Sequence, residues 1–122
     1  MIRVPLRLRS GGREVELSAI LNTGFESDLP LISVPLHVAE ELGLYLGETR
    51  EFDTIGSFRG LALVSDKPIE VSVRKGGRRS RAEAYVIVVP GEDEAIMSYL
   101  LARELKLVVD LAREEWWIAS PD

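Results

Sequence analysis

Hydrophobic and polar residues alternate along the first part of the chain in a pattern typical of a half-buried β-hairpin. From Ile2 to Arg9 apolar side chains occupy every second position, and arginines fill most of the positions between them. The turn sequence Ser10-Gly11-Gly12-Arg13 follows, and its glycines allow the positive φ angles of a tight turn. A second alternating strand ends in the apolar run Ala19-Ile20-Leu21. We expect this strand to run from the surface into the core and to carry Asn22 inward.

A second hairpin with the same order of features is predicted later in the chain. Pro68 to Arg74 alternates again, Lys75-Gly76-Gly77-Arg78 repeats the turn chemistry, and Arg81 to Val89 ends in an apolar run. Between the two hairpins, the segment from Glu51 to Val64 has weaker alternation and two glycines, which indicates a mobile hairpin or loop and not a core strand. Two similar halves are too few for a solenoid and indicate a pseudo-symmetric β domain.

One short helix is predicted after each hairpin. Ser33 is expected to cap the first helix, and Gly43 is expected to end it. Its apolar positions recur at helical spacing: Leu36, Ala39 and Leu42. The second helix is expected to begin at Glu92-Asp93-Glu94, because negative charge is favourable at a helix N-terminus. Its predicted apolar face consists of Ile96, Leu100, Leu101 and Leu105. A last strand pair, 107–111 and 115–119, places the two tryptophans on opposite sides.

Composition narrows the classes of function. With 122 residues, 46% of them hydrophobic, the chain fits a single domain, 1–122, with a core of its own. It has no cysteine, and His37 is its one histidine, so thiolate zinc sites and multi-histidine metal centres are excluded. We predict no metal and no cofactor. No stretch reaches the roughly 18 apolar residues of a membrane span, so we expect no membrane contact and a soluble, cytoplasmic protein.

The charge of the chain bears on its partners. A formal net charge of −5 argues against broad attraction to nucleic acid, and no nucleic-acid partner is predicted. The run from Arg74 to Arg81 is nevertheless strongly basic. Two interpretations of this run stay open: a functional basic patch, or the solvated tip of a hairpin, which is the commoner case.

The residues around Asn22 resemble a protease signature. From Leu17 to Ser27 an apolar strand leads into Asn-Thr-Gly-Phe. This is similar to the Asp-Thr-Gly motif of the retropepsin-like aspartic proteases (retroviral type, clan AA), in particular a microbial subgroup with Asp-Thr-Gly-Phe. A second segment, from Glu94 to Asp110, resembles the family's apolar-apolar-Gly motif, helix and closing strand, with Ser98 where glycine is usual. The alternative is a small β-rich domain in which Asn22-Thr23-Gly24 is only a turn.

The resemblance covers essentially the whole chain and implies a mainly β fold. That fold is a retropepsin-like acid protease β-barrel of pseudo-symmetric hairpins with one or two short helices, closed by homodimerisation. Proteases of this kind use two carboxylates that share a proton, and a twofold-related copy must supply the second because one short chain carries one motif. By resemblance, Asn22 occupies the position of the catalytic aspartate, Thr23 braces the two motifs, and Gly24 lets the backbone approach the substrate.

The resemblance also predicts a substrate surface with a flap around residues 54–58. Ile55, Gly56 and Phe58, together with Phe25, are expected to contact a bound peptide or unfolded protein. An asparagine amide cannot take up a proton at neutral pH, so the chain as written is predicted to be an inactive endopeptidase. Either Asn22 is an inactivating substitution, or the chain is a natural pseudo-protease that binds extended peptides without cutting them.

Overall fold

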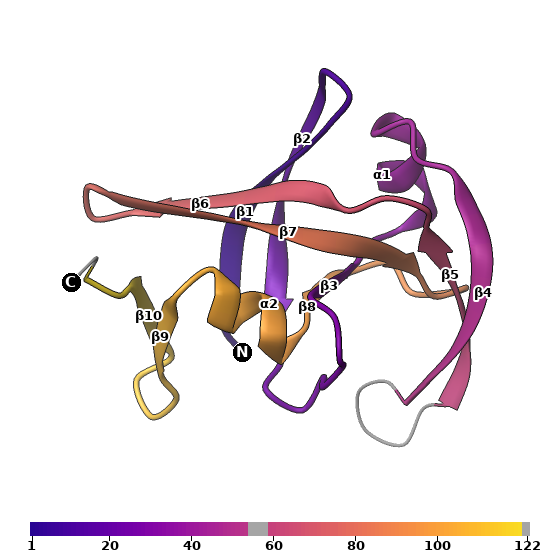
Figure 1. Ribbon diagram of the computed structural model, residues 1–122. Helices are drawn as coiled ribbons and strands as arrows, with labels where there is room; N and C mark the ends of the chain where they lie inside the picture. Colours follow the sequence, from indigo (N-terminus) through magenta and orange to yellow (C-terminus); the bar gives the residue numbers. More distant parts are fainter. Residues whose placement is uncertain (54–58, 121–122) are drawn as a thin grey trace.

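The computed structural model of the protein describes residues 1–53 and 59–120, and for residues 48–61 the description is confined to the backbone. The strands follow one another as β1 (Arg3–Ser10), β2 (Arg13–Leu21), β3 (Leu31–Ser33), β4 (Leu46–Asp53), β5 (Arg59–Ser65), β6 (Ile69–Lys75), β7 (Arg78–Val88), β8 (Ala95–Met97), β9 (Leu107–Asp110) and β10 (Glu115–Ile118). The helices are α1 (Leu36–Glu41) and α2 (Tyr99–Glu104) (Figure 1). In the described part of the chain, neither helix has the length to cross a membrane.

The strands form a closed barrel with an attached arm. Their order in the main sheet is β3-β8-β2-β1-β6-β7-β5-β4, and an additional pairing of β3 with β7 closes six of them into a ring. β5 and β4 continue outward from β7 as a two-stranded arm (Figure 1). β9 and β10 form a separate two-stranded sheet. The predicted mainly β barrel with two short helices is therefore confirmed.

Both predicted hairpins are present, and their turns use the expected glycines. Gly11 and Gly12 have φ angles of 54° and 82°, and Gly76 and Gly77 have φ angles of 61° and 76°. Only glycine adopts such angles without a steric penalty, so these pairs fix the position of each turn. Along β1 the burial alternates strictly from Arg3 to Leu8, with the apolar residues inside and the others exposed, as the alternation in the sequence predicts.

The two halves of the chain exchange strands. β2 of the first half pairs in parallel with β8 of the second, and β7 of the second half pairs in parallel with β3 of the first. The helices that follow carry related sequences, Ala39-Glu40-Glu41-Leu42 and Ala102-Arg103-Glu104-Leu105. This exchange explains how two similar units make one barrel. The first hairpin needs β8 of the second half, and the second hairpin needs β3 of the first half, to bury its apolar face.

The two parallel ladders, β2 with β8 and β3 with β7, show which residues of the first half correspond to which residues of the second. Ala19 pairs with Ala95, and Val86 pairs with Ile32. Since Ala95 and Ile32 precede their helices by the same distance, Ala19 corresponds to Val86. The turn Asn22-Thr23-Gly24 therefore corresponds to 89–91, which is Val-Pro-Gly.

The hydrophobic core has two parts. The larger cluster fills the barrel and includes the inward residues of β1, β6 and β7 with the buried faces of both helices. A smaller cluster lies where β2, β3, β5, β7 and β8 meet, and its buried members are Ile20, Phe25, Leu31, Ala62, Val64, Ile87, Val89 and Ile96. The smaller cluster lies directly below the turn at Asn22, because Ile20 and Phe25 flank that turn in the sequence.

Both predicted helix starts are wrong. Ser33 does not cap a helix but lies buried in β3, and α1 begins after Pro35 without a side-chain cap. Leu36 is 51% exposed and is not part of the apolar face. The triplet 92–94 precedes a strand, since Ala95–Met97 pairs with β2 as β8, and α2 begins only after Ser98. At the first helix, β3 includes only the expected cap, Ser33. At the second, β8 occupies positions that local signals assign to the helix, including Ile96.

The last strand pair is confirmed and is fastened to the second hairpin. Trp116 of β10 is 8% exposed and Trp117 is 42% exposed, so the two rings face opposite sides. Lys75 Nζ donates a hydrogen bond to the carbonyl of Trp116 at 2.7 Å and lies 4.2 Å from the centre of its ring. Arg78 donates a hydrogen bond to the carbonyl of Ile118 at 2.8 Å. The tip of β6–β7 thus holds β10 against the barrel.

Candidate active site

The turn at Asn22 begins directly after β2. Leu21, the last residue of β2, donates its backbone N–H to the carbonyl of Ile2 at 2.9 Å, and Phe25 N donates to Asn22 O at 3.2 Å to close the turn. Asn22 is partly exposed, and Thr23 and Gly24 are exposed. The strand therefore delivers the three residues of the predicted site, in order, to the surface at the end of the barrel. The expected inward placement of Asn22 is wrong, because β2 ends at Leu21 and the chain turns at the surface directly after its buried segment.

The side chain of Asn22 is held by the backbone of the same turn. Its Oδ1 accepts a hydrogen bond from the backbone N–H of Gly24 at 2.7 Å. Asparagine and aspartate share this ability to bond the backbone two residues on. A Cβ atom on residue 24 would lie 3.2 Å from Asn22 Oδ1, so glycine leaves room for this close approach. The hydrogen bond from Gly24 fixes the position of Asn22 Oδ1.

Phe25 supports the turn from below. Its side chain is 1% exposed and packs in the smaller core cluster. Its carbonyl accepts a hydrogen bond from the backbone N–H of Tyr99, the first residue of α2, at 2.8 Å. The predicted contact of Phe25 with a substrate stays a prediction, whereas its packing role follows directly from its burial.

Ser98 is the residue that sequence reasoning underestimated. It is fully buried, and its Oγ accepts hydrogen bonds from the backbone N–H groups of Leu101 at 3.2 Å and Leu31 at 3.0 Å. Its own N–H donates to the carbonyl of Leu31 at 3.0 Å. Serine is a preferred N-cap residue, and this preference could have identified Ser98 as the start of α2. Through Ser98, the helix that anchors Phe25 is joined to β3.

The predicted flap can be placed only in part. The arm formed by β4 and β5 is paired as far as Asp53 with Arg59, which confirms a hairpin in this region. Ile55, Gly56 and Phe58, the predicted substrate contacts of the flap, lie outside the described residues.

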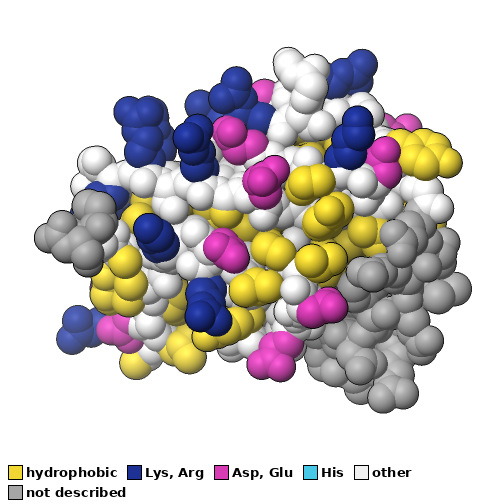
Figure 2. Space-filling view, in the orientation of Figure 1, with side chains coloured by type: hydrophobic (Ala, Val, Ile, Leu, Met, Phe, Trp, Pro, Cys, Tyr) yellow, Lys and Arg dark blue, Asp and Glu magenta, His cyan; other side chains and the backbone are white. Residues whose placement is uncertain are grey.

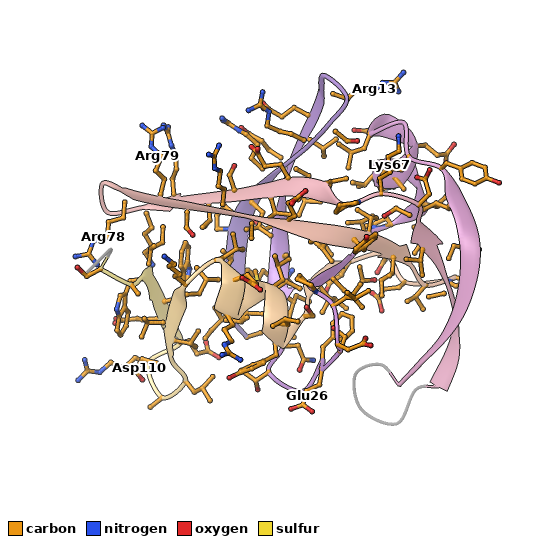
Figure 3. The ribbon with its side chains drawn as sticks, in the orientation of Figure 1. Arg13, Glu26, Lys67, Arg78, Arg79 and Asp110 are labelled. Carbon is orange, nitrogen blue, oxygen red and sulfur yellow. The ribbon has the colours of Figure 1, made fainter. Side chains whose placement is uncertain are left out.

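Charged side chains surround the turn without forming a metal site. Glu26 and Asp28 are exposed in the loop after the turn, and Figure 3 shows Glu26 directed away from the barrel. Arg3 Nη2 contacts Glu94 Oε1 at 3.0 Å. Among the residues that the structure describes, no three His, Cys, Asp or Glu side chains come together in a way that could hold a metal ion.

Comparisons with known proteins bear on the fold. The chain is similar to the crystal structure of the retroviral protease-like domain of Ddi1 from Leishmania major, with a TM-score of 0.58 and 16% sequence identity. The superposition covers 97% of this chain and 87% of that domain. No protein-family model and no curated protein matches the sequence. The likeness is one of structure, and it shows that the chain has a retropepsin-like fold.

Proposed function

We propose that the chain is the scaffold of an aspartic endopeptidase that acts as a homodimer, inactive as written because Asn22 replaces the catalytic aspartate. The observation that carries the proposal is the position of Asn22. It is a partly exposed side chain, oriented by the N–H of Gly24, at the end of β2 in a retropepsin-like barrel. The retropepsin-like neighbour supports an aspartic-protease-like scaffold, and the proposal adds the chemistry.

The need for a second chain follows from the corresponding turn of the second half. Residues 89–91 are Val-Pro-Gly, and Val89 is buried in the smaller core cluster. No carboxylate or amide stands at this turn, so the second half of the same chain cannot supply the second catalytic group. A twofold-related copy can supply it, with both Asn22 turns facing each other across the axis. Thr23 would then brace the two turns.

The chemistry explains why the asparagine silences the site. In an aspartate pair one carboxylate polarises the scissile carbonyl while the other removes a proton from the attacking water. The amide of Asn22 keeps the shape of the carboxylate and its bond from Gly24, but it cannot accept that proton. An Asn22→Asp variant should therefore keep the fold and gain the missing base.

The alternative function is a natural pseudo-protease that binds extended peptides and does not cut them. Asn22 and Ser98 are the departures from the family pattern that suggest it. Ser98, however, is fully buried and bonded to the backbone of Leu31 and Leu101. Its substitution is explained by the folding of α2, so only Asn22 still favours the alternative, and we prefer the inactivated endopeptidase.

Cleavage of an unfolded protein such as casein, followed from acid to neutral pH, tests the proposal. Sedimentation velocity first establishes whether the native chain and the Asn22→Asp variant are dimers. We expect acid-favoured cleavage by the variant alone, with the native chain and Asn22→Ala as inactive controls. A folded, dimeric variant without cleavage would count against the endopeptidase. Capture of extended peptides on an array by the native chain would then support the pseudo-protease.

A further inference from the structure

A wide groove opens between the two hairpins of the barrel. β1 and β6 pair over only three residues each, 7–9 with 70–72, and beyond this ladder the hairpins separate (Figure 1). The groove has a volume of about 1110 Å³ and is walled by β1, β2, β6 and β7, with residues of α2 and the end of β10 at its margin. None of the residues 22–25 lines it, so it is distinct from the candidate active site.

The groove is basic although the chain is acidic. Seven of its lining residues are arginine or lysine and three are glutamate, while the whole chain has a net charge of −5. Figure 2 shows Lys and Arg side chains gathered at the upper left of the molecule, over the β6–β7 hairpin. A concentration of one sign of charge in a concave surface raises the local concentration of ligands of opposite sign.

Some of these cations are already neutralised. Arg7 contacts Glu16 at 2.7 Å and Glu14 at 3.5 Å. The hydrogen bond that Arg7 donates to Glu16, together with the negative charges of Glu14 and Glu16, raises the pKa of the Arg7 guanidinium. Arg9 contacts Glu14 at 3.3 Å. In the described part of the chain, by contrast, no ion pair engages Arg74, Arg79 or Arg81, three of the four arginines of the β6–β7 wall.

Two of the unengaged arginines repel each other. Arg74 and Arg79 are direct partners across the β6–β7 ladder. Like charges directly opposite each other destabilise a strand pair. Lys75 and Arg78 form the neighbouring pair of like charges. Both donate hydrogen bonds to carbonyls of β10, which offsets the repulsion between them. An anionic group in the groove would relieve the pair Arg74 and Arg79.

The shape of the groove favours an extended peptide. Beyond the three-residue ladder, no other strand of the described chain pairs with the facing edges of β1 and β6. Such edges can accept an added strand. Arg79 and Arg81 lie two positions apart on one strand, about 6.6–6.8 Å, which is also the spacing of alternate side chains in an extended peptide.

We propose that this groove binds an acidic segment of polypeptide in an extended conformation. The glutamates of the groove repel the continuous negative charge of a nucleic acid. A peptide can avoid this repulsion, because it can carry carboxylates only at the positions that lie beside Arg79 and Arg81. The site goes beyond the proposed function, because binding requires no hydrolysis. Ser18 lines the groove and Asn22 follows four residues later, about 13 Å along the strand. A protein held in the groove by an acidic stretch would thus have neighbouring residues within reach of the turn at Asn22.

Fluorescence anisotropy with a labelled peptide of alternating glutamate and serine tests the proposal on the native chain. The variant Arg79→Ala/Arg81→Ala removes two cations from the groove. The matched control Arg13→Ala/Arg113→Ala removes two exposed arginines outside it. We expect the groove variant to raise the Kd about tenfold, the loss that two exposed ion pairs allow, and the control to leave the Kd unchanged.

Circular dichroism melting verifies that each variant is folded before its Kd is compared. A lysine–serine peptide and a single-stranded oligonucleotide of the same length serve as competing probes. The proposal is overturned by a folded native chain that does not bind the glutamate peptide, by equal losses in the two double variants, or by tighter binding of the oligonucleotide. Each of these results is independent of whether Asn22→Asp cleaves protein, so the groove and the candidate active site are tested separately.

Discussion

The turns at the ends of β2 and β7 occupy corresponding places in the two halves, but they differ in chemistry. The first, Asn22-Thr23-Gly24, presents a partly exposed amide that its own backbone orients. The second, at 89–91, begins with the buried Val89 and turns at Gly91, which has a φ angle of 86°. One turn is built to display a polar atom and the other to close the core. Under the proposed function, a chain with this division supplies one of the two turns of a shared site.

The helices that follow the turns differ in the same way. Ser98 caps α2 with its side chain, whereas Pro35, at the corresponding position before α1, makes no side-chain cap. α2 is also the helix whose first residue, Tyr99, holds the carbonyl of Phe25. The better-capped helix is therefore the one that braces the Asn22 turn. The side-chain cap that distinguishes the halves thus belongs to the helix that contacts the candidate active site.

The largest effect should come from removing the support below the Asn22 turn. Phe25→Ala deletes a fully packed aromatic side chain and is expected to cost about 3–5 kcal/mol of unfolding free energy, because a cavity replaces it. Asp93→Ala, an exposed change in the loop that follows the other turn, should stay within about 0.5 kcal/mol. Urea denaturation measures both. Equal losses of unfolding free energy in the two variants would contradict the claim that Phe25 supports the Asn22 turn.

A smaller effect is expected at the helix caps. Ser98→Ala removes the acceptor of two buried backbone N–H groups and should cost about 2–3 kcal/mol. Pro35→Ala removes no cap bond, and its cost should stay within about 1 kcal/mol. Thermal unfolding of the two variants compares the caps directly. A Pro35 variant as unstable as the Ser98 variant would show that side-chain capping is not what distinguishes the helices.

The smallest effect is expected at the candidate active site itself. Asn22→Ala loses the single hydrogen bond to Gly24 N and should cost about 1 kcal/mol. Asn22→Asp keeps that acceptor, so its stability near neutral pH should match the native chain within about 0.5 kcal/mol. Chemical denaturation of the three proteins at the same pH gives these differences. A strongly destabilised Asn22→Asp variant would mean that the site is not shaped for a carboxylate.

Much of the fold could be predicted from local pattern. Strict alternation and paired glycines predict both hairpins, and the alternation of Trp116 and Trp117 predicts the opposite burial that the structure shows. The turn at Asn22 was also located, because an apolar strand and a turn-forming triplet are both local signals. These features depend on residues close together in the sequence.

What the sequence could not reveal depends on distant partners. β3 and β8 are three residues long and exist because they pair with β7 and β2. A buried run of this length has no periodicity that separates strand from helix, so local signals assign Ser33 and the triplet 92–94 to helix starts. The burial of Phe25 likewise depends on a cluster assembled from five strands. The groove between the hairpins was visible only as a basic run, and its walls come from both halves of the chain.

The account's central claim is that two copies of this chain share one catalytic site, and a mixing experiment tests it most directly. A fixed amount of the Asn22→Asp variant is assayed for cleavage of unfolded protein while native chain is added. Random exchange between dimers should reduce the activity to about half at equal amounts and further at higher ratios, because a mixed dimer holds one carboxylate only. Activity that stays constant while mixed dimers form, as shown by mass spectrometry, would contradict a site shared between two chains.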